Sequence, residues 1–143
     1  MTPQKQRFRH KPEEGEFGDC HRTCLACILG IDRDLVPNFG VHYGDVAKFL
    51  ASEAEFLASI GMRAIDIPFQ GTVSLGTMLE SLGRLVPNAH LIFAGQSRTG
   101  LNHSVIIKDG EIVWNPSLDD VGIIGPCDDG HYWITILTST HLL

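Results

Sequence analysis

A cysteine-rich segment near the start of the chain, CHRTCLAC at residues 20–27, holds the first residue types that could do chemistry. Asp19 precedes it as an expected N-cap and Gly30 follows as a typical C-terminal stop, which predicts a helix over residues 20–29. Cys20 would then lie in the first turn, where free N–H groups and the helix dipole stabilise a thiolate. We therefore predict that Cys20 is a nucleophile.

The other two cysteines of this segment have a different setting. Cys24 and Cys27 follow Cys20 on the same helical face, deeper among apolar residues, and are predicted to be small core hydrophobes. Two alternatives stay open for the segment. Cys20 could serve packing alone, or the three cysteines could hold a metal: their spacing resembles the cluster-binding loop of radical-SAM enzymes, and His21 could add a zinc ligand. No complete ligand set is visible, so we expect no metal and no cofactor.

A cysteine nucleophile needs a base, and a histidine base needs a group that fixes its orientation. The two-residue hairpin signal Asp109-Gly110 pairs the predicted strands 102–108 and 111–114. With a regular register, His103 faces about position 116, so Asn115 lies beside it within a register slip of one. The sequence thus predicts His103 as the base and Asn115 as its orienting amide. Taken singly, each could be an ordinary strand or turn residue.

The elements that position these residues form an α+β pattern, because helices come first and an antiparallel sheet follows. Strand 62–67 is expected to end at Pro68, and the third helix to end at Gly83. A loop is expected from Asn115 to Gly130, with Cys127 accessible but not activated. The other expected elements are helices over residues 46–60 and 75–82 and strands over 90–94 and 132–137.

Composition limits the classes of function. The 143 residues fit one domain at 18–143 after an extended arm at 1–17, and the net charge of −6 argues against a nucleic-acid partner. No apolar run is long enough for a membrane span, and no signal peptide is visible. Three of the four cysteines share one helix face, which is a poor disulfide framework, so we expect a reducing, cytoplasmic setting.

Around Cys20, His103 and Asn115 the chain resembles the papain-like cysteine peptidases. The resemblance is strongest to the branch that includes leader-processing peptidases of bacteriocin exporters, in which an Asp-Cys pair also starts the helix. More narrowly, the chain resembles small uncharacterised phage-associated proteins of that superfamily. The broad resemblance rests on Asp19-Cys20, Asn102-His103-Ser104-Val105 and Trp114-Asn115-Pro116, and the narrower one on residues 18–23, 36–39 and 125–133.

The resemblance implies a papain-like fold in which the helix carrying Cys20 packs on the C-terminal sheet. It implies a thiol hydrolase that cleaves an amide, peptide or isopeptide bond of a peptide or protein substrate through an acyl-enzyme. Papain-like enzymes stabilise the oxyanion with the cysteine N–H and an upstream glutamine. Position 14 is Glu14 here, so Gln6 is expected in that role, with Gln4 as the alternative. A transglutaminase- or acyltransferase-like enzyme with an amine acceptor, or a catalytically silent peptide-binding module, remain alternative readings.

Overall fold

A computed structural model of the chain describes residues 1–142. Within that range, three α-helices and a six-stranded antiparallel sheet form an α+β fold, as predicted. The helices are α1 (Cys20–Leu29), α2 (Val46–Ser59) and α3 (Leu75–Leu85). The strands are β1 (Met62–Gln70), β2 (Leu91–Ser97), β3 (Asn102–Lys108), β4 (Glu111–Trp114), β5 (Ile123–Gly125) and β6 (His131–Ser139). None of the helices in this range is long and apolar enough to cross a bilayer.

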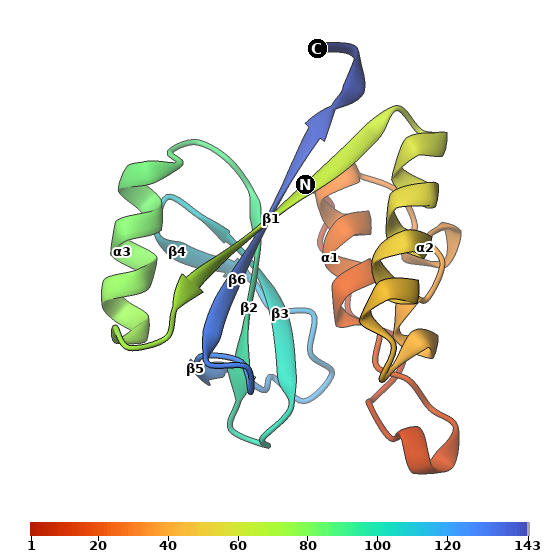
Figure 1. Cartoon of the computed structure of the whole chain (residues 1–143), viewed down its shortest axis with the longest axis horizontal. Helices are drawn as coiled ribbons and strands as arrows, with labels where there is room; N and C mark the ends of the chain where they lie inside the picture. The colour runs from red at the N-terminus through yellow and green to blue at the C-terminus, as the bar shows by residue number, and fades with distance from the viewer. Residues whose placement is uncertain (143) are drawn as a thin grey trace.

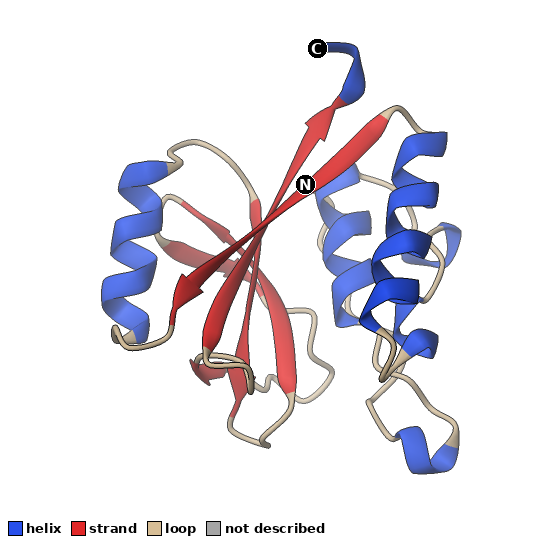
Figure 2. Cartoon of the chain, in the orientation of Figure 1, coloured by secondary structure: helices blue, strands red, loops and turns tan. Residues whose placement is uncertain are grey.

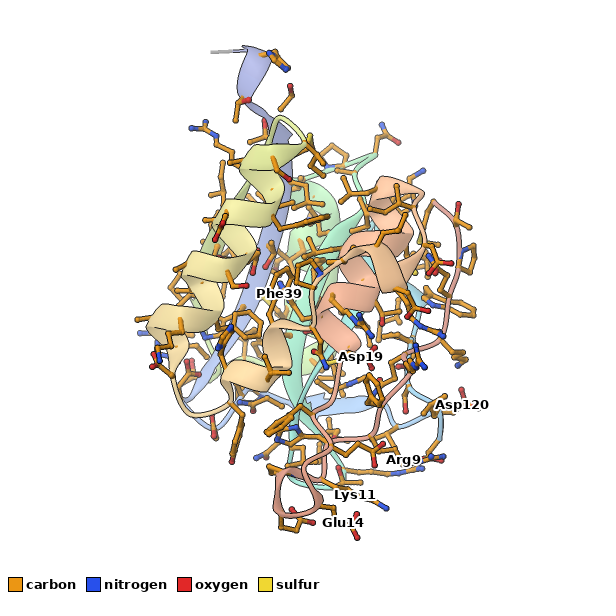
Figure 3. The ribbon with its side chains drawn as sticks, turned by 90° about the vertical axis from the view of Figure 1, so that its right-hand side faces the viewer. Arg9, Lys11, Glu14, Asp19, Phe39 and Asp120 are labelled. Atoms are coloured by element: carbon orange, nitrogen blue, oxygen red, sulfur yellow. The ribbon has the colours of Figure 1, made fainter. Side chains whose placement is uncertain are left out.

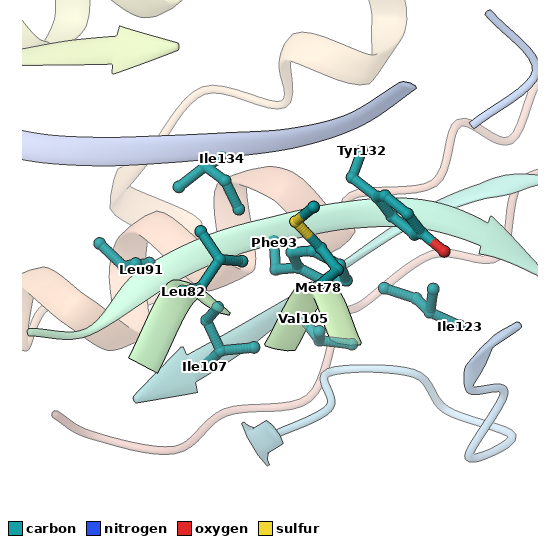
Figure 4. Close-up of a cluster of buried hydrophobic side chains, with 9 residues drawn as sticks. All are labelled: Met78, Leu82, Leu91, Phe93, Val105, Ile107, Ile123, Tyr132 and Ile134. Carbon is teal, nitrogen blue, oxygen red and sulfur yellow. The ribbon is translucent and has the colours of Figure 1, made fainter. Parts of the chain in front are cut away.

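The sheet separates two helical layers, with α3 on one face and α1 and α2 on the other (Figures 1 and 2). Its strand order is β1-β6-β2-β3-β4, and β5 pairs with β2. Alternating residues of a strand point to opposite faces. In β2, Leu91 and Phe93 accordingly pack in the cluster under α3 shown in Figure 4, whereas Ile92 packs under α1.

Helix α1 is the element that holds Cys20 on the sheet. It begins at Cys20 and ends at Leu29, and Gly30 follows with a φ of 70°, as predicted. Cys24 and Cys27 are fully buried in the cluster that α1 forms with β2 and β3. Burial raises the pKa of both thiols, which keeps them in the unreactive protonated form.

Strand β2 runs three residues past the predicted end at Ala94. Two further predicted ends are wrong because tertiary packing overrides a local stop signal. Pro68 lies inside β1, which is an edge strand and therefore tolerates a residue that cannot donate to a sheet bond. Gly83 lies inside α3. A Cβ at this position would come within 2.8 Å of the Gly110 backbone nitrogen, so glycine lets the helix approach the β3–β4 turn closely.

The loop predicted between Asn115 and Gly130 contains a strand. Its short strand β5 pairs antiparallel with the end of β2 across a register shift. β5 has only three residues and no clear alternation, so no period-2 signal marks it in the sequence.

The N-terminal arm is bound to the body of the protein, and near its end it forms a short 3-10 helix, η1 (Pro12–Glu14). The backbone N–H of Thr2 donates to the carbonyl of Cys27 at 2.9 Å, and that of Gln6 donates to the carbonyl of Pro116 at 2.8 Å. Figure 3 shows the arm, with Arg9 on it, descending past the start of α1. These bonds bring the arm to both the cysteine helix and the end of the β4 segment.

Candidate functional site

Asp19 occupies the N-cap position of α1, but its side chain makes no capping hydrogen bond, contrary to the sequence prediction. Its buried carboxylate instead accepts from the backbone N–H groups of Arg7 and Phe8, at 2.9 and 2.8 Å, and from Nε of Arg22 at 3.0 Å. Asp19 thus ties the arm to the helix. The first-turn N–H groups beside Cys20 remain uncapped by this side chain and can serve a ligand.

The Asp19 contact leads to a stability prediction. Asp19→Asn keeps an oxygen acceptor but removes the negative charge beside Arg22, which is itself buried, so the variant is expected to lose about 2 kcal/mol of unfolding free energy. Urea denaturation followed by circular dichroism measures this loss. Asp34→Asn is the matched control, because that carboxylate is 46 % exposed, and its ion pairs contribute about 0–1 kcal/mol. Equal stability losses in both variants would contradict the assignment.

Helix α1 packs on β3, and this places the Cys20 thiol beside the ring of His103 and the backbone of Ser104. Burial alone raises the pKa of Cys20, but the interaction with His103 outweighs it, so the pKa is lowered. Burial likewise lowers the pKa of His103, and the Cys20 thiolate reverses this, so that pKa is raised. Both directions favour a thiolate–imidazolium pair.

Asn115 lies on the other side of the His103 ring. Its Oδ1 is 2.8 Å from Nε2 of His103 and also accepts from the backbone N–H of Ser117 at 3.0 Å, while its Nδ2 donates to the carbonyl of Val121 at 3.0 Å. Because Asn115 uses Nε2, the ring nitrogen left for Cys20 is Nδ1. The three residues predicted from the sequence therefore lie together, with Asn115 hydrogen bonded to His103 and His103 beside Cys20.

The register that brings Asn115 to His103 differs from the predicted regular hairpin. Ile107 pairs with Ile112, but Ile106 pairs with Trp114, which leaves Val113 as the extra residue of a β-bulge. A bulge bends the strand and re-aims the residues that follow. The hydrogen bonds of Asn115 to its own loop then complete the placement.

A cavity of about 740 Å³ opens over Cys20. One wall comes from α1, α2 and the segment between them; the other comes from the β2–β3 turn, the loop after β4 and the arm. Cys20 and His103 both line it, so the proposed nucleophile faces a space large enough for a peptide segment.

The structure distinguishes the two glutamines considered for the oxyanion. Gln6 is about 9 % exposed and lines the cavity with Cys20; its Nε2 donates to the carbonyl of Phe8 at 2.6 Å, which leaves its second N–H for a ligand. Gln4 lies elsewhere. Its side-chain amide bonds the carbonyl of Ile31 at 2.7 Å and the N–H of Arg33 at 2.9 Å, outside the cavity lining.

Sequence reasoning missed one pair of the site and misplaced one cysteine. His21 contacts Glu53, with 3.0 Å between Nε2 and Oε2, and lines the cavity. The available signal was the position of Glu53, four residues after Phe49 and four before Leu57, on the apolar face of α2. Cys127 is buried rather than accessible, and burial together with Asp129 and Asp128 raises its pKa to about 12, so it is not activated. Within residues 1–141, no cluster of three or more His, Cys, Asp or Glu side chains could hold a metal ion.

Comparisons with known proteins identify no relative of this chain. No protein-family model matches the chain, and neither a curated protein nor a solved structure shows significant similarity to it. The geometry of the cavity is therefore the basis for a proposed function.

Proposed function

We propose that this chain is a papain-like thiol hydrolase that cleaves an amide, peptide or isopeptide bond through an acyl-enzyme. The observation that supports it is the cluster of Cys20, His103 and Asn115, in which Cys20 and His103 line the cavity and Asn115 hydrogen bonds to His103 behind them. A thiol, an imidazole and a carboxamide in that order are the nucleophile, the base and the orienting group of cysteine hydrolases. The uncapped start of α1 adds a positive field at the sulfur.

Each residue has a defined role in the reaction. The Cys20 thiolate attacks the acyl carbonyl, and the oxyanion that forms accepts hydrogen bonds from the Cys20 N–H and from Nε2 of Gln6. His103, as imidazolium, gives its Nδ1 proton to the leaving amine, and the thioester forms as that amine departs. His103 then takes a proton from water, which attacks the thioester and releases the acid and the free thiol.

A thioester probe tests this proposal without knowledge of the natural substrate. Incubation with the acetyl thioester of 2-mercaptoethanol should acetylate Cys20, release mercaptoethanol and then lose the acetyl group to water, all followed by mass spectrometry of the intact chain and its peptides. Cys20→Ser is the matched control. Acetylation of another cysteine in preference to Cys20, or of none, would favour a silent peptide-binding module; faster release by added glycinamide than by water would favour an acyltransferase.

Asn115 gives a graded prediction for the same assay. Asn115→Ala should lower the acylation rate without abolishing it, because the nucleophile and the base remain and only the orientation of His103 is lost. Asn115→Asp should be tolerated, since a carboxylate oxygen also accepts from the ring N–H. The same thioester rates measure both. A fully active Asn115→Ala, together with an inactive Asp119→Ala, would assign the third residue to the neighbouring loop instead.

A further inference from the structure

A second histidine lies beside the nucleophile, and its partner is a buried carboxylate. Glu53, on the inner face of α2, is only 3 % exposed, and its Oε2 is 3.0 Å from Nε2 of His21. Its other oxygen, Oε1, is buried without a hydrogen-bond partner among the described residues. The His21 ring is therefore the one hydrogen-bonded group that stabilises this carboxylate.

Such a pair is costly in this setting. The ring centroid of His21 lies 6.4 Å from that of Phe39 and 5.3 Å from that of Phe49, so the surroundings are aromatic. A protein with a buried ion pair among apolar groups is often no more stable than a variant with well-packed hydrophobic residues in its place. A buried charged pair whose histidine lines a cavity beside a nucleophile is therefore a candidate for a functional role rather than for stability.

The groups around His21 favour its cationic form. Burial alone lowers its pKa, but Glu53 from α2, the neighbouring Cys20 and Asp66 from β1 all raise it, and the pKa is raised overall. Of these, Asp66 already accepts a hydrogen bond from Thr135 at 2.6 Å. Nε2 of His21 contacts Glu53, and the partly exposed His21 ring lines the cavity.

We propose that His21, held by Glu53, is the specificity residue that binds a carboxylate of the substrate beside the scissile acyl carbon. This inference rests on the proposed thiol hydrolase, because it places the carboxylate next to the carbonyl that Cys20 attacks. The carboxylate belongs either to the acyl part of the substrate or to its leaving group.

Other cations of the cavity are less suited to this role. Arg9 and Lys11 also line it, but their side chains are 50 % and 49 % exposed and already paired with Asp119 and Glu14. Arg22 lines it too and is buried, but its guanidinium already donates to the Asp19 carboxylate and the Val36 carbonyl. Exposed charges are screened by water and salt, whereas a desolvated cation attracts an anion more strongly. The His21 side chain, at 18 % exposure, is more desolvated than the side chains of Arg9 and Lys11.

Two alkylating reagents that differ only in charge test the proposal. Iodoacetate and iodoacetamide transfer the same carbon to the Cys20 sulfur with loss of iodide, but iodoacetate carries a carboxylate where iodoacetamide carries an amide. The rate constant for iodoacetate divided by that for iodoacetamide, both at Cys20, should be highest in the unmodified protein. His21→Gln and Glu53→Gln should each lower it by about tenfold, because the first removes the cation and the second removes the carboxylate that stabilises the cationic form of His21.

The matched control is His131→Gln. His131 also faces a carboxylate, with 3.8 Å between its Nδ1 and Oδ1 of Asp129, but it does not line the cavity, so the ratio should not change. The iodoacetamide rate in each variant reports whether Cys20 is still correctly placed. Reaction with both reagents and an unchanged ratio in His21→Gln and Glu53→Gln would overturn this inference alone. Failure of Cys20 to react with either reagent in the unmodified protein would overturn the proposed hydrolase as well.

Thioesters separate the two sources of the carboxylate. The acetyl thioester of mercaptoacetate carries it on the leaving group, and the succinyl thioester of 2-mercaptoethanol carries it on the acyl group. Whichever acylates Cys20 faster than the neutral acetyl thioester of 2-mercaptoethanol identifies the side, and His21→Gln should remove that advantage. No advantage for either thioester would overturn the inference.

Discussion

Limiting iodoacetamide at about pH 6 is expected to alkylate Cys20 ahead of the three other cysteines. At this pH an ordinary thiol is almost wholly protonated. The pKa of Cys20 is lowered by His103, so the thiolate is present on the acidic side of the usual cysteine range. The thiols of Cys24, Cys27 and Cys127 are buried with raised pKa values and should remain unlabelled. Peptide mapping after a short reaction measures the order.

His103→Ala should lower the rate of Cys20 alkylation at about pH 6 by at least about tenfold and move its pH profile toward alkaline pH. The sign follows from the loss of the cation: desolvation of the thiolate is then opposed only by the smaller effects of Ser104 and His21, so the pKa of Cys20 rises. His90→Ala is a suitable control, because this histidine lies outside the cavity lining. A Cys20 rate that does not respond to His103→Ala would favour the peptide-binding module over the hydrolase.

Gln6→Ala is expected to lower the rate of acylation of Cys20 by a thioester about 10²–10³-fold, the usual loss on removal of one oxyanion donor. Alkylation by iodoacetamide should be unaffected, because displacement of iodide creates no oxyanion. The variant thus separates transition-state stabilisation from simple reactivity of the sulfur. Both rates are measured on the same protein by mass spectrometry.

Gln4→Ala is the matched control for this experiment. Its side-chain amide bonds Ile31 and Arg33 outside the cavity, so neither rate should change. Equal losses of acylation and alkylation in Gln6→Ala would mean that Gln6 only holds the arm in place, through its bond to the Phe8 carbonyl, and that the second oxyanion donor is another group.

The local signals that were correct are those that depend on few neighbours. The helix over residues 20–29 and the β3–β4 hairpin both follow from periodicity and from glycines with positive φ at Gly30 and Gly110. The juxtaposition of Cys20, His103 and Asn115 was accessible from the sequence because chemistry restricts which residue types can act together.

What the sequence did not reveal depends on tertiary contacts. The carboxylate of Asp19 binds the arm, which comes from earlier in the chain, instead of its own helix. The pairing of His21 with Glu53 requires α1 and α2 to lie side by side, and no sequence spacing encodes that contact. Cys127 is buried because β5 and its flanking loop pack on β2, which loop composition does not predict.

The docked arm affects when the cavity is assembled during folding. The cavity is assembled from Gln6 near the start of the chain, Cys20 in the first helix and a histidine and amide from the sheet. Contacts between residues so distant in sequence form slowly, since long loops must close first. During folding, Cys24 and Cys27 therefore change from accessible to protected, while Cys20 gains reactivity only once β3 lies against α1. Thiol labelling at acidic pH can thus time the assembly of the cavity separately from the collapse of the core.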